Sequence, residues 1–283
     1  MSKTDFLWNE LIYGGHWFSI SASALVLSIM IILQVQIRWE LLLIIYLQIQ
    51  CLFNYNHYKE LEIDIISKSD RSLYLKKYIR FLPFLTILYG FGFTILILYF
   101  GNFLNLAFAI SLFVLGLLFT KIFKKWTSKI IGFKTFYTAI TFASFFILFI
   151  NFYCSNEINF LVISLFIIFF FRFMIGTGFS DIKDIEIDQK QNLKTFPVYF
   201  GKEKFLNILH IINILTFIAF VIILFTINIA FILISFFTYV YTLLYIEKAK
   251  KEKTNTQLLT QIYIDGEFIF WPIILLLGLI IFN

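Results

Sequence analysis

The chain carries the stretch Asp181-Ile182-Lys183-Asp184-Ile185-Glu186-Ile187-Asp188 directly after an apolar segment, 158–178, that is long enough to cross a membrane. A second acid-rich stretch ends the apolar segment 40–58 and reads Asn56-His57-Tyr58-Lys59-Glu60-Leu61-Glu62-Ile63-Asp64. Carboxylates beside a bilayer are costly unless something compensates their charge. Two such stretches in a chain with only 17 acidic residues therefore predict one shared site. Facing carboxylates suit hard divalent cations, and Mg²⁺ usually bridges protein carboxylates to substrate phosphates.

The composition predicts an all-α, polytopic integral membrane protein. Hydrophobic residues make up 60% of the chain, charged residues 14%, and the mean hydropathy is +0.89. The first strongly apolar run begins near Trp17, has membrane length and lacks the small-residue site that follows a cleavable signal peptide, so none is expected.

Nine apolar segments predict nine transmembrane helices, at about 17–37, 40–58, 80–100, 103–120, 133–153, 158–178, 205–225, 227–246 and 268–282, the last of them short. With nine spans, every basic residue except Arg38 falls on one side of the membrane. The positive-inside rule makes that side cytoplasmic, so we expect a cytoplasmic N-terminus and both acidic motifs on cytoplasmic loops. The expected location is a bacterial plasma membrane.

The net charge of +6 is interpreted first as this orientation signal. The basic residues are spread over four loops at the membrane surface, which argues against a nucleic-acid partner. Such loops favour contact with anionic membrane lipids or with a diphosphate.

The first acidic stretch places Asn56, Glu60 and Asp64 at i, i+4 and i+8, so a helix carries all three on one face. An amide oxygen and two carboxylates are hard oxygen ligands, and we predict all three as metal ligands. Arg71 follows in the loop, and its guanidinium can bind a diphosphate through two parallel hydrogen bonds.

The second stretch places Asp181, Asp184 and Asp188 at i, i+3 and i+7, again on one face, and these are also predicted metal ligands. A loop follows, with Lys194 and Pro197, from which Lys194 can reach toward a phosphate. For either stretch alone, a solvated helix end is an equally good interpretation; two equivalent stretches together disfavour it. Asp265 and Glu267, before the last segment, are interpreted as a solvated loop.

On these residues the chain resembles the UbiA superfamily of intramembrane prenyltransferases. Its first motif reads roughly N-D-x-x-D-x-x-x-D, matched from Asn56 to Asp64 with His57 and Glu60 at the first two acid positions, and Arg71 matches a following arginine. Its second motif reads roughly D-x-x-D-x-x-x-D, then a glycine, K-T-L-P-V and a glycine. The matching residues are Asp181, Asp184, Asp188, Lys194, Thr195, Pro197, Val198 and Gly201, with Asn192 where glycine is usual.

The resemblance implies a single domain over residues 1–283 that performs Mg²⁺-dependent transfer of a prenyl group from a prenyl diphosphate to an aromatic or lipid acceptor. It implies catalytic roles for Asp64, Asp184 and Asp188. The residues expected to bind substrate are Lys68, Arg71, Lys134, Arg172 and Lys194. For Arg172 two roles stay open, a diphosphate contact or a side chain that reaches the inner interface. The oligomeric state is left open.

Two other functions stay open. A terpene cyclase of the same fold needs no acceptor, because the allylic cation is attacked by its own alkene. A degenerate, non-catalytic relative is the other alternative, given His57 and Glu60. A transporter is disfavoured, because transporters place ionisable residues near the midplane and the acids here gather at helix ends.

The topology is testable by cysteine-accessibility labelling. Cysteines placed at Ser69 or Lys190 should react only from the cytoplasmic side, because the loops at about 59–79, 121–132, 179–204 and 247–267 hold nearly all the Lys and Arg residues. Periplasmic labelling of either position would defeat the nine-helix arrangement with a cytoplasmic N-terminus.

Overall fold

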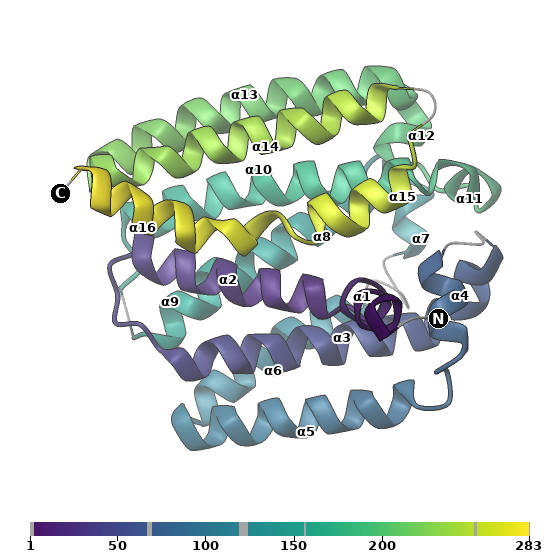
Figure 1. Cartoon of the computed structure of the whole chain (residues 1–283), viewed down its shortest axis with the longest axis horizontal. Helices are drawn as coiled ribbons and strands as arrows, with labels where there is room; N and C mark the ends of the chain where they lie inside the picture. Colours follow the sequence, from purple (N-terminus) through teal and green to yellow (C-terminus); the bar gives the residue numbers. More distant parts are fainter. Residues whose placement is uncertain (1–2, 67–69, 119–123, 156, 252–253, 283) are drawn as a thin grey trace.

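The protein is a bundle of helices. The computed structural model describes residues 3–66, 70–118, 124–155, 157–251 and 254–282, without the side chains at 3, 60–66, 116 and 124. All the regular elements in these ranges are helical, and the ranges contain no strand (Figure 1). The all-α prediction is therefore confirmed.

The first half of the chain forms a run of helices. They are α1 (Lys3–Tyr13), α2 (His16–Ile32), α3 (Trp39–Ile66), α4 (Asp70–Lys76), α5 (Leu82–Phe100), α6 (Phe103–Leu118) and α7 (Lys124–Thr127). Side-chain caps and prolines set several helix starts along the chain: the Asn102 side chain accepts the Asn105 N–H before α6, and Pro83 stands in the first turn of α5.

The second half contains two membrane-length helices that are interrupted by wider, π-helical turns. Its elements are α8 (Phe133–Ala143), the π-turn η2 (Ser144–Phe149), α9 (Ile150–Tyr153), α10 (Phe160–Ile182), α11 (Ile185–Lys190), α12 (Phe196–Phe200), α13 (Lys202–Ile227), the 3₁₀ turn η3 (Ile229–Phe231), α14 (Ile232–Lys250), α15 (Thr256–Leu259), the π-turn η4 (Thr260–Ile264), the 3₁₀ turn η5 (Glu267–Phe270) and α16 (Trp271–Phe282).

A helix occupies each of the nine predicted apolar segments, but fewer are long and apolar enough to span a membrane. In the described ranges six pass by length and composition: 82–100, 133–153, 160–182, 202–227, 229–250 and 256–282. A seventh is added if α1 and α2, bent by 58° at Gly14–Gly15, count as one span. The number of nine spans and the side on which the loops lie stay predictions.

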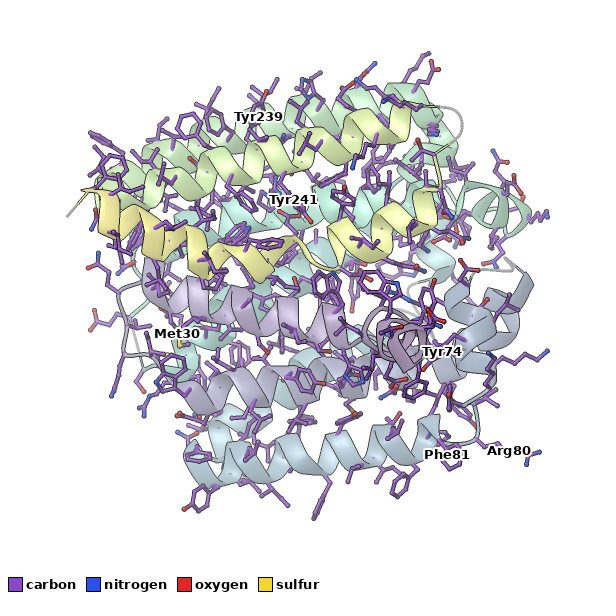
Figure 2. All side chains as sticks on the ribbon, viewed as in Figure 1. Met30, Tyr74, Arg80, Phe81, Tyr239 and Tyr241 are labelled. Atoms are coloured by element: carbon purple, nitrogen blue, oxygen red, sulfur yellow. The ribbon has the colours of Figure 1, made fainter. Side chains whose placement is uncertain are left out.

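The outside of the bundle is apolar. Figure 2 shows side chains projecting outward along the whole length of the helices, among them Phe81, which is 62% exposed. Further exposed aromatic and aliphatic residues lie on α5, α6, α10, α13 and α16. A surface of this kind suits lipid rather than water, and with the apolar helices it identifies an integral membrane protein.

The short helices α4, α7, α11 and α12 gather at one end of the bundle, near α1 (Figure 1). The helix α3 carries the first acidic stretch and runs toward α4, against which it packs, while α11 carries the end of the second. The fold therefore brings the two acidic stretches to the same end of the molecule, as one shared site requires.

The last apolar segment is longer than predicted and is broken. The expected helix covers 268–282, whereas helical structure runs from Thr256 to Phe282 with a break around Asp265–Gly266. The break packs closely on α2: the Trp17 indole donates to the Ile262 carbonyl at 3.1 Å, and a Cβ on Gly266 would meet the same indole at 2.1 Å. The sequence prediction was wrong here because a discontinuous helix has no uniform apolar run.

The close contact between α16 and η3 predicts the effect of a methyl group at Gly278. A Cβ there would meet the Ala230 carbonyl oxygen at 1.9 Å, and backbone cannot move aside as a side chain can. We expect Gly278→Ala to destabilise the protein by about 2 kcal/mol, the middle of the range for overpacking, measured by thermal unfolding in detergent. Gly92→Ala on α5 is the matched control, because its Cβ would meet only the tip of Leu47, at 3.3 Å. Equal effects of the two substitutions would contradict the packing described here.

Candidate functional site

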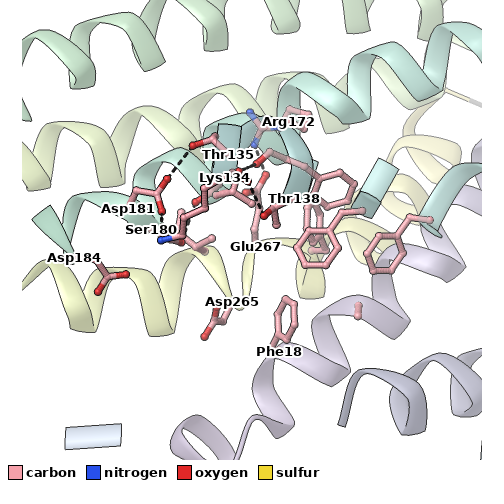
Figure 3. Close-up of a pocket in the computed structure, with 18 residues that line it drawn as sticks. Phe18, Lys134, Thr135, Thr138, Arg172, Ser180, Asp181, Asp184, Asp265 and Glu267 are labelled. Carbon is pink, nitrogen blue, oxygen red and sulfur yellow. Dashed lines mark hydrogen bonds and ion pairs between the residues drawn. The ribbon is translucent and has the colours of Figure 1, made fainter. Parts of the chain in front are cut away.

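A cavity of about 260 Å³ opens between α2, α8, α10 and the broken C-terminal segment (Figure 3). It combines charged residues with a set of phenylalanines. The lining residues used below are Lys134, Thr135, Thr138, Arg172, Phe173, Asp181, Asp184, Asp265, Glu267 and Phe268, with Phe18, Phe142 and Phe146. A charged pole joined to an apolar pole is the form of a site for an amphiphilic ligand.

The charged pole is built by α8 and the end of α10. Lys134 places its ammonium 2.7 Å from the Asp181 carboxylate and 3.9 Å from Asp188, and the Thr135 hydroxyl donates to Asp181 at 2.8 Å (Figure 3). Asp181 is only 2% exposed, so these contacts compensate a carboxylate that has left water. The predicted residues Lys134, Asp181 and Asp188 are thus brought together.

The other two predicted metal ligands of the second stretch, Asp184 and Asp188, differ in their surroundings. Asp184 lines the cavity and is paired with its neighbour Lys183 at 2.8 Å. Asp188, on α11, is 4% exposed. Burial raises the pKa of the Asp188 carboxyl to about 6, although the Lys134 charge opposes the rise. Asp188 is therefore a carboxylate that lacks sufficient positive charge around it.

The first acidic stretch is described only in part. Asn56 is half-buried on α3, and the backbone of α3 continues helical through Glu60 and Asp64, as predicted. The side chains of Glu60 and Asp64, and all of Lys68, lie outside the described residues. Their predicted roles stay predictions.

Two unsatisfied oxygens bear on metal binding. Within the described residues, Asn56 Oδ1 and Asp188 Oδ2 are buried without a hydrogen-bond partner. Both are hard oxygen donors of the kind that Mg²⁺ takes, and an orphaned buried acceptor gains from a cation. Among the described side chains, no three His, Cys, Asp or Glu residues cluster closely enough to form a metal site by themselves. The donor set fits Mg²⁺ only as a site shared with other ligands, such as phosphate oxygens.

Arg71, predicted to bind substrate, is held by the rest of the protein. Its guanidinium forms an ion pair with Asp265 at 2.7 Å and donates to the Ile12 carbonyl at 3.2 Å. The interpretation of Asp265 as a solvated acid is therefore wrong: it is partly buried, lines the cavity and fixes the arginine of α4. The contact places Arg71 next to the cavity.

Lys194 has a different position from the one expected. Its side chain is exposed and does not line the cavity. Its backbone instead joins two loops, because its N–H donates to Thr127 and its carbonyl accepts from Gly132, at 2.9 and 2.8 Å. Nearby, Asn192 adopts the left-handed backbone that its place in the motif predicts, with φ 55°.

Arg172 is buried inside the bundle, and its predicted contact with a diphosphate stays a prediction. It is 3% exposed in the middle of α10 and forms an ion pair with Glu267 on η5. It also donates to Asn213 on α13 at 3.0 Å and to Thr242 on α14 at 2.9 Å. One arginine thus joins four elements of the bundle, and its side chain does not reach the interface.

Glu267 is a buried, cavity-lining residue that the sequence interpretation missed. It is 3% exposed, so the solvated-loop assignment is wrong. Two signals pointed to it: an arginine in the middle of an apolar span needs a counter-ion, and Glu267 adjoins the last apolar run. The helix break around Asp265–Gly266 brings it inside.

The apolar pole lies deeper in the bundle. The Phe173 ring packs against Phe142 and Phe146, each at 5.5 Å between ring centroids, and against Phe268 at 5.9 Å. Phe173 and Asp181 are eight residues apart on α10, which is about 12 Å along the helix axis. The charged pole at Asp181 and the aromatic pole at Phe173 are therefore about 12 Å apart along the cavity.

Comparison with known proteins identifies a family with which this chain shares its sequence pattern. The model of the UbiA prenyltransferase family matches residues 18–273. Two similar solved structures are of a UbiA homologue from Archaeoglobus fulgidus. One is bound to GPP and Mg²⁺, with 15% identity, a TM-score of 0.66 and coverage of 95% of this chain and 98% of the other. The other is bound to DMAPP and Mg²⁺, with 17% identity and the same TM-score and coverage.

A third similar structure is of a digeranylgeranylglyceryl phosphate synthase, with 20% identity, a TM-score of 0.53 and coverage of 97% of this chain and 96% of the other. Comparison with curated protein sequences finds no significant match. At these identities the solved structures establish the fold alone.

The buried ion pair predicts an asymmetric mutational response. We expect Glu267→Ala to destabilise the protein by about 3–5 kcal/mol, because Arg172 would remain charged and buried without its counter-ion. The double variant Arg172→Leu with Glu267→Leu should unfold near the wild-type temperature in detergent, because both charges leave together. Glu247→Ala, which removes an exposed pair with Lys250, is the control. Equal losses for Glu267→Ala and Glu247→Ala would contradict the role of the buried pair.

Proposed function

The chain belongs to the UbiA prenyltransferase family, and from this premise we propose that it transfers a prenyl group from a prenyl diphosphate to an aromatic or lipid acceptor, with Mg²⁺ as cofactor. The observation that carries the proposal is the cavity with a charged pole and a phenylalanine pole. A prenyl diphosphate has the same two parts in the same order.

The charged pole would bind the diphosphate. Mg²⁺ held by Asp184, Asp188 and Asn56, with Glu60, Asp64 and Asp181 as further ligands, would neutralise the diphosphate and stabilise it as a leaving group. The orphaned oxygens of Asn56 and Asp188 support this placement. Lys134 supplies a positive charge between Asp181 and Asp188 and is well placed to donate to a phosphate oxygen.

Arg71 would add a second donor if it exchanged Asp265 for a phosphate oxygen, since its pair with Asp265 already borders the cavity. Lys68 and Lys194 are proposed as outer contacts on the same side. We place this pole toward the cytoplasm on the strength of the basic loops.

The phenylalanine pole would hold the prenyl tail. Its aromatic walls exclude water, which would otherwise capture the allylic cation as the carbon–oxygen bond breaks. The aromatic faces also carry negative potential that favours a nearby cation. The acceptor would then attack C1 of the prenyl group and lose a proton.

The direct test is mass spectrometry of products from membranes that hold the full chain and are given a panel of prenyl diphosphates, with and without aromatic and lipid acceptors. A product that needs the acceptor supports transfer, whereas a cyclic product from the diphosphate alone assigns a cyclase. No product with any combination would support a non-catalytic relative.

The proposed metal site predicts that activity is lost on chelation and restored by Mg²⁺. Asp184→Ala and Asp188→Ala should each lower turnover by at least about a hundredfold, with membrane levels of the protein unchanged, because each removes a charged metal ligand. Asp181→Ala should be milder, since Lys134 and Thr135 already compensate Asp181.

Glu186→Ala is the matched control for this prediction, because Glu186 is an exposed acid on the same short helix as Asp188. Full turnover in EDTA, or in either of the two aspartate variants, would overturn the proposed site.

A further inference from the structure

The ion pair between Arg172 and Glu267 has a property that a purely structural pair does not need. Both residues line the cavity, and both are only 3% exposed. Arg172 directly precedes Phe173, whose ring packs on Phe142 and Phe268. A neutralised but strongly polar pair therefore adjoins the apolar pole, and Figure 3 shows Arg172 and Glu267 to the right of Asp181.

The pair retains unused hydrogen-bonding capacity of both signs. A guanidinium offers five N–H donors, and those of Arg172 serve Asn213 once, Thr242 once and Glu267 once. In the described part of the chain these contacts leave one N–H of Nη1 unused, and the Nε–H has no partner either but is enclosed by protein atoms. Glu267 accepts from Arg172 through Oε1, whereas a carboxylate has two oxygens and about four acceptor positions.

Building on the proposed function, we propose that Arg172 and Glu267 form the recognition site for a neutral hydroxyl group of the acceptor. A hydroxyl both donates and accepts, so one group can donate to Glu267 and accept from Arg172. A carboxylate at the same place would be repelled by Glu267. A hydrocarbon group at this place would leave the spare Nη1–H of Arg172 and the second oxygen of Glu267 without partners, and buried polar groups without partners are costly.

The alternative is that the pair only ties η5 to α10. That role would be indifferent to the ligand, so it predicts no discrimination between a hydroxyl and its methyl ether. Recognition of a hydroxyl predicts strong discrimination, because methylation removes the donor and adds bulk in a closed site.

The experiment uses probes that differ in one substituent: 1-naphthol, 1-methoxynaphthalene and 1-naphthoate. Their Kd values are measured by titration calorimetry of the full chain in nanodiscs, with empty nanodiscs subtracted. We expect wild type to bind the naphthol at least about tenfold more tightly than either of the other two, as hydrogen bonds to charged groups would give. Equal binding of the three probes excludes an aromatic hydroxyl as the ligand of this pair.

A second pair of probes, 1-O-hexadecylglycerol and its dimethyl ether, distinguishes a lipid alcohol from an aromatic hydroxyl. Discrimination within only one of the two probe sets assigns the source of the hydroxyl. Absence of discrimination in both sets overturns the proposal.

The variants place the discrimination at this pair. The quantity compared is the Kd of the methyl ether divided by the Kd of the hydroxyl probe. In the double variant Arg172→Leu with Glu267→Leu this ratio should fall to within about twofold. In the control Lys250→Leu with Glu247→Leu, which removes an exposed pair elsewhere, the ratio should stay at the wild-type value. If the first double variant does not fold, the single variant Glu267→Gln is measured instead, and it should also lower this ratio. A wild-type ratio in the folded variant overturns the proposal.

A separate titration with GPP and Mg²⁺ keeps this inference distinct from the proposed function. Binding of GPP without hydroxyl discrimination removes the inference and leaves the proposed function standing. Hydroxyl discrimination without GPP binding supports the recognition site and counts against the proposed function.

Discussion

Charge compensation inside an apolar bundle is the constraint on which the structure depends. Three ion pairs meet it: Lys134 with Asp181 joins α8 to α10, Arg172 with Glu267 joins α10 to η5, and Arg71 with Asp265 joins α4 to the C-terminal segment. Each pair borders the same cavity. A buried charge without its partner destabilises the folded protein by several kcal/mol. These contacts therefore fix how the helices pack and also which charged groups line the cavity.

The same constraint separates what could be predicted from the sequence from what could not. The acidic stretches stand at helix ends with helical spacing, so their clustering and the left-handed Asn192 could be inferred from local patterns. For Glu267 the sequence indicated only that Arg172 needs a counter-ion. Its burial could not be inferred, because it depends on a helix break packed on Trp17, far away in the chain. The phosphate contact predicted for Lys194 from its motif position stays a prediction, and its backbone bonds to Thr127 and Gly132, which join two loops, could not be inferred from the motif.

The predicted metal ligands also differ in how far the protein itself satisfies them. Asp181 has a lysine and a threonine, whereas Asp188 and Asn56 each keep a buried oxygen without a hydrogen-bond partner in the described residues. Unsatisfied acceptors of this kind reduce stability and persist where a ligand uses them. The proposed function uses the unsatisfied oxygens of Asp188 and Asn56 as metal ligands, whereas the contacts of Asp181 hold α8 against α10.

The position of Glu267 near the end of the chain has a consequence for biogenesis. Arg172 is synthesised first and enters the bilayer with α10, ninety-five residues before its counter-ion emerges from the ribosome. Until then Asn213 and Thr242 are the contacts that follow it, each from a helix made in between. An arginine in the hydrocarbon core is costly in that interval, so the bundle stays incomplete until the last segment inserts. Truncation of about the last thirty residues would therefore remove one helix and would also leave the buried charge of Arg172 without its counter-ion.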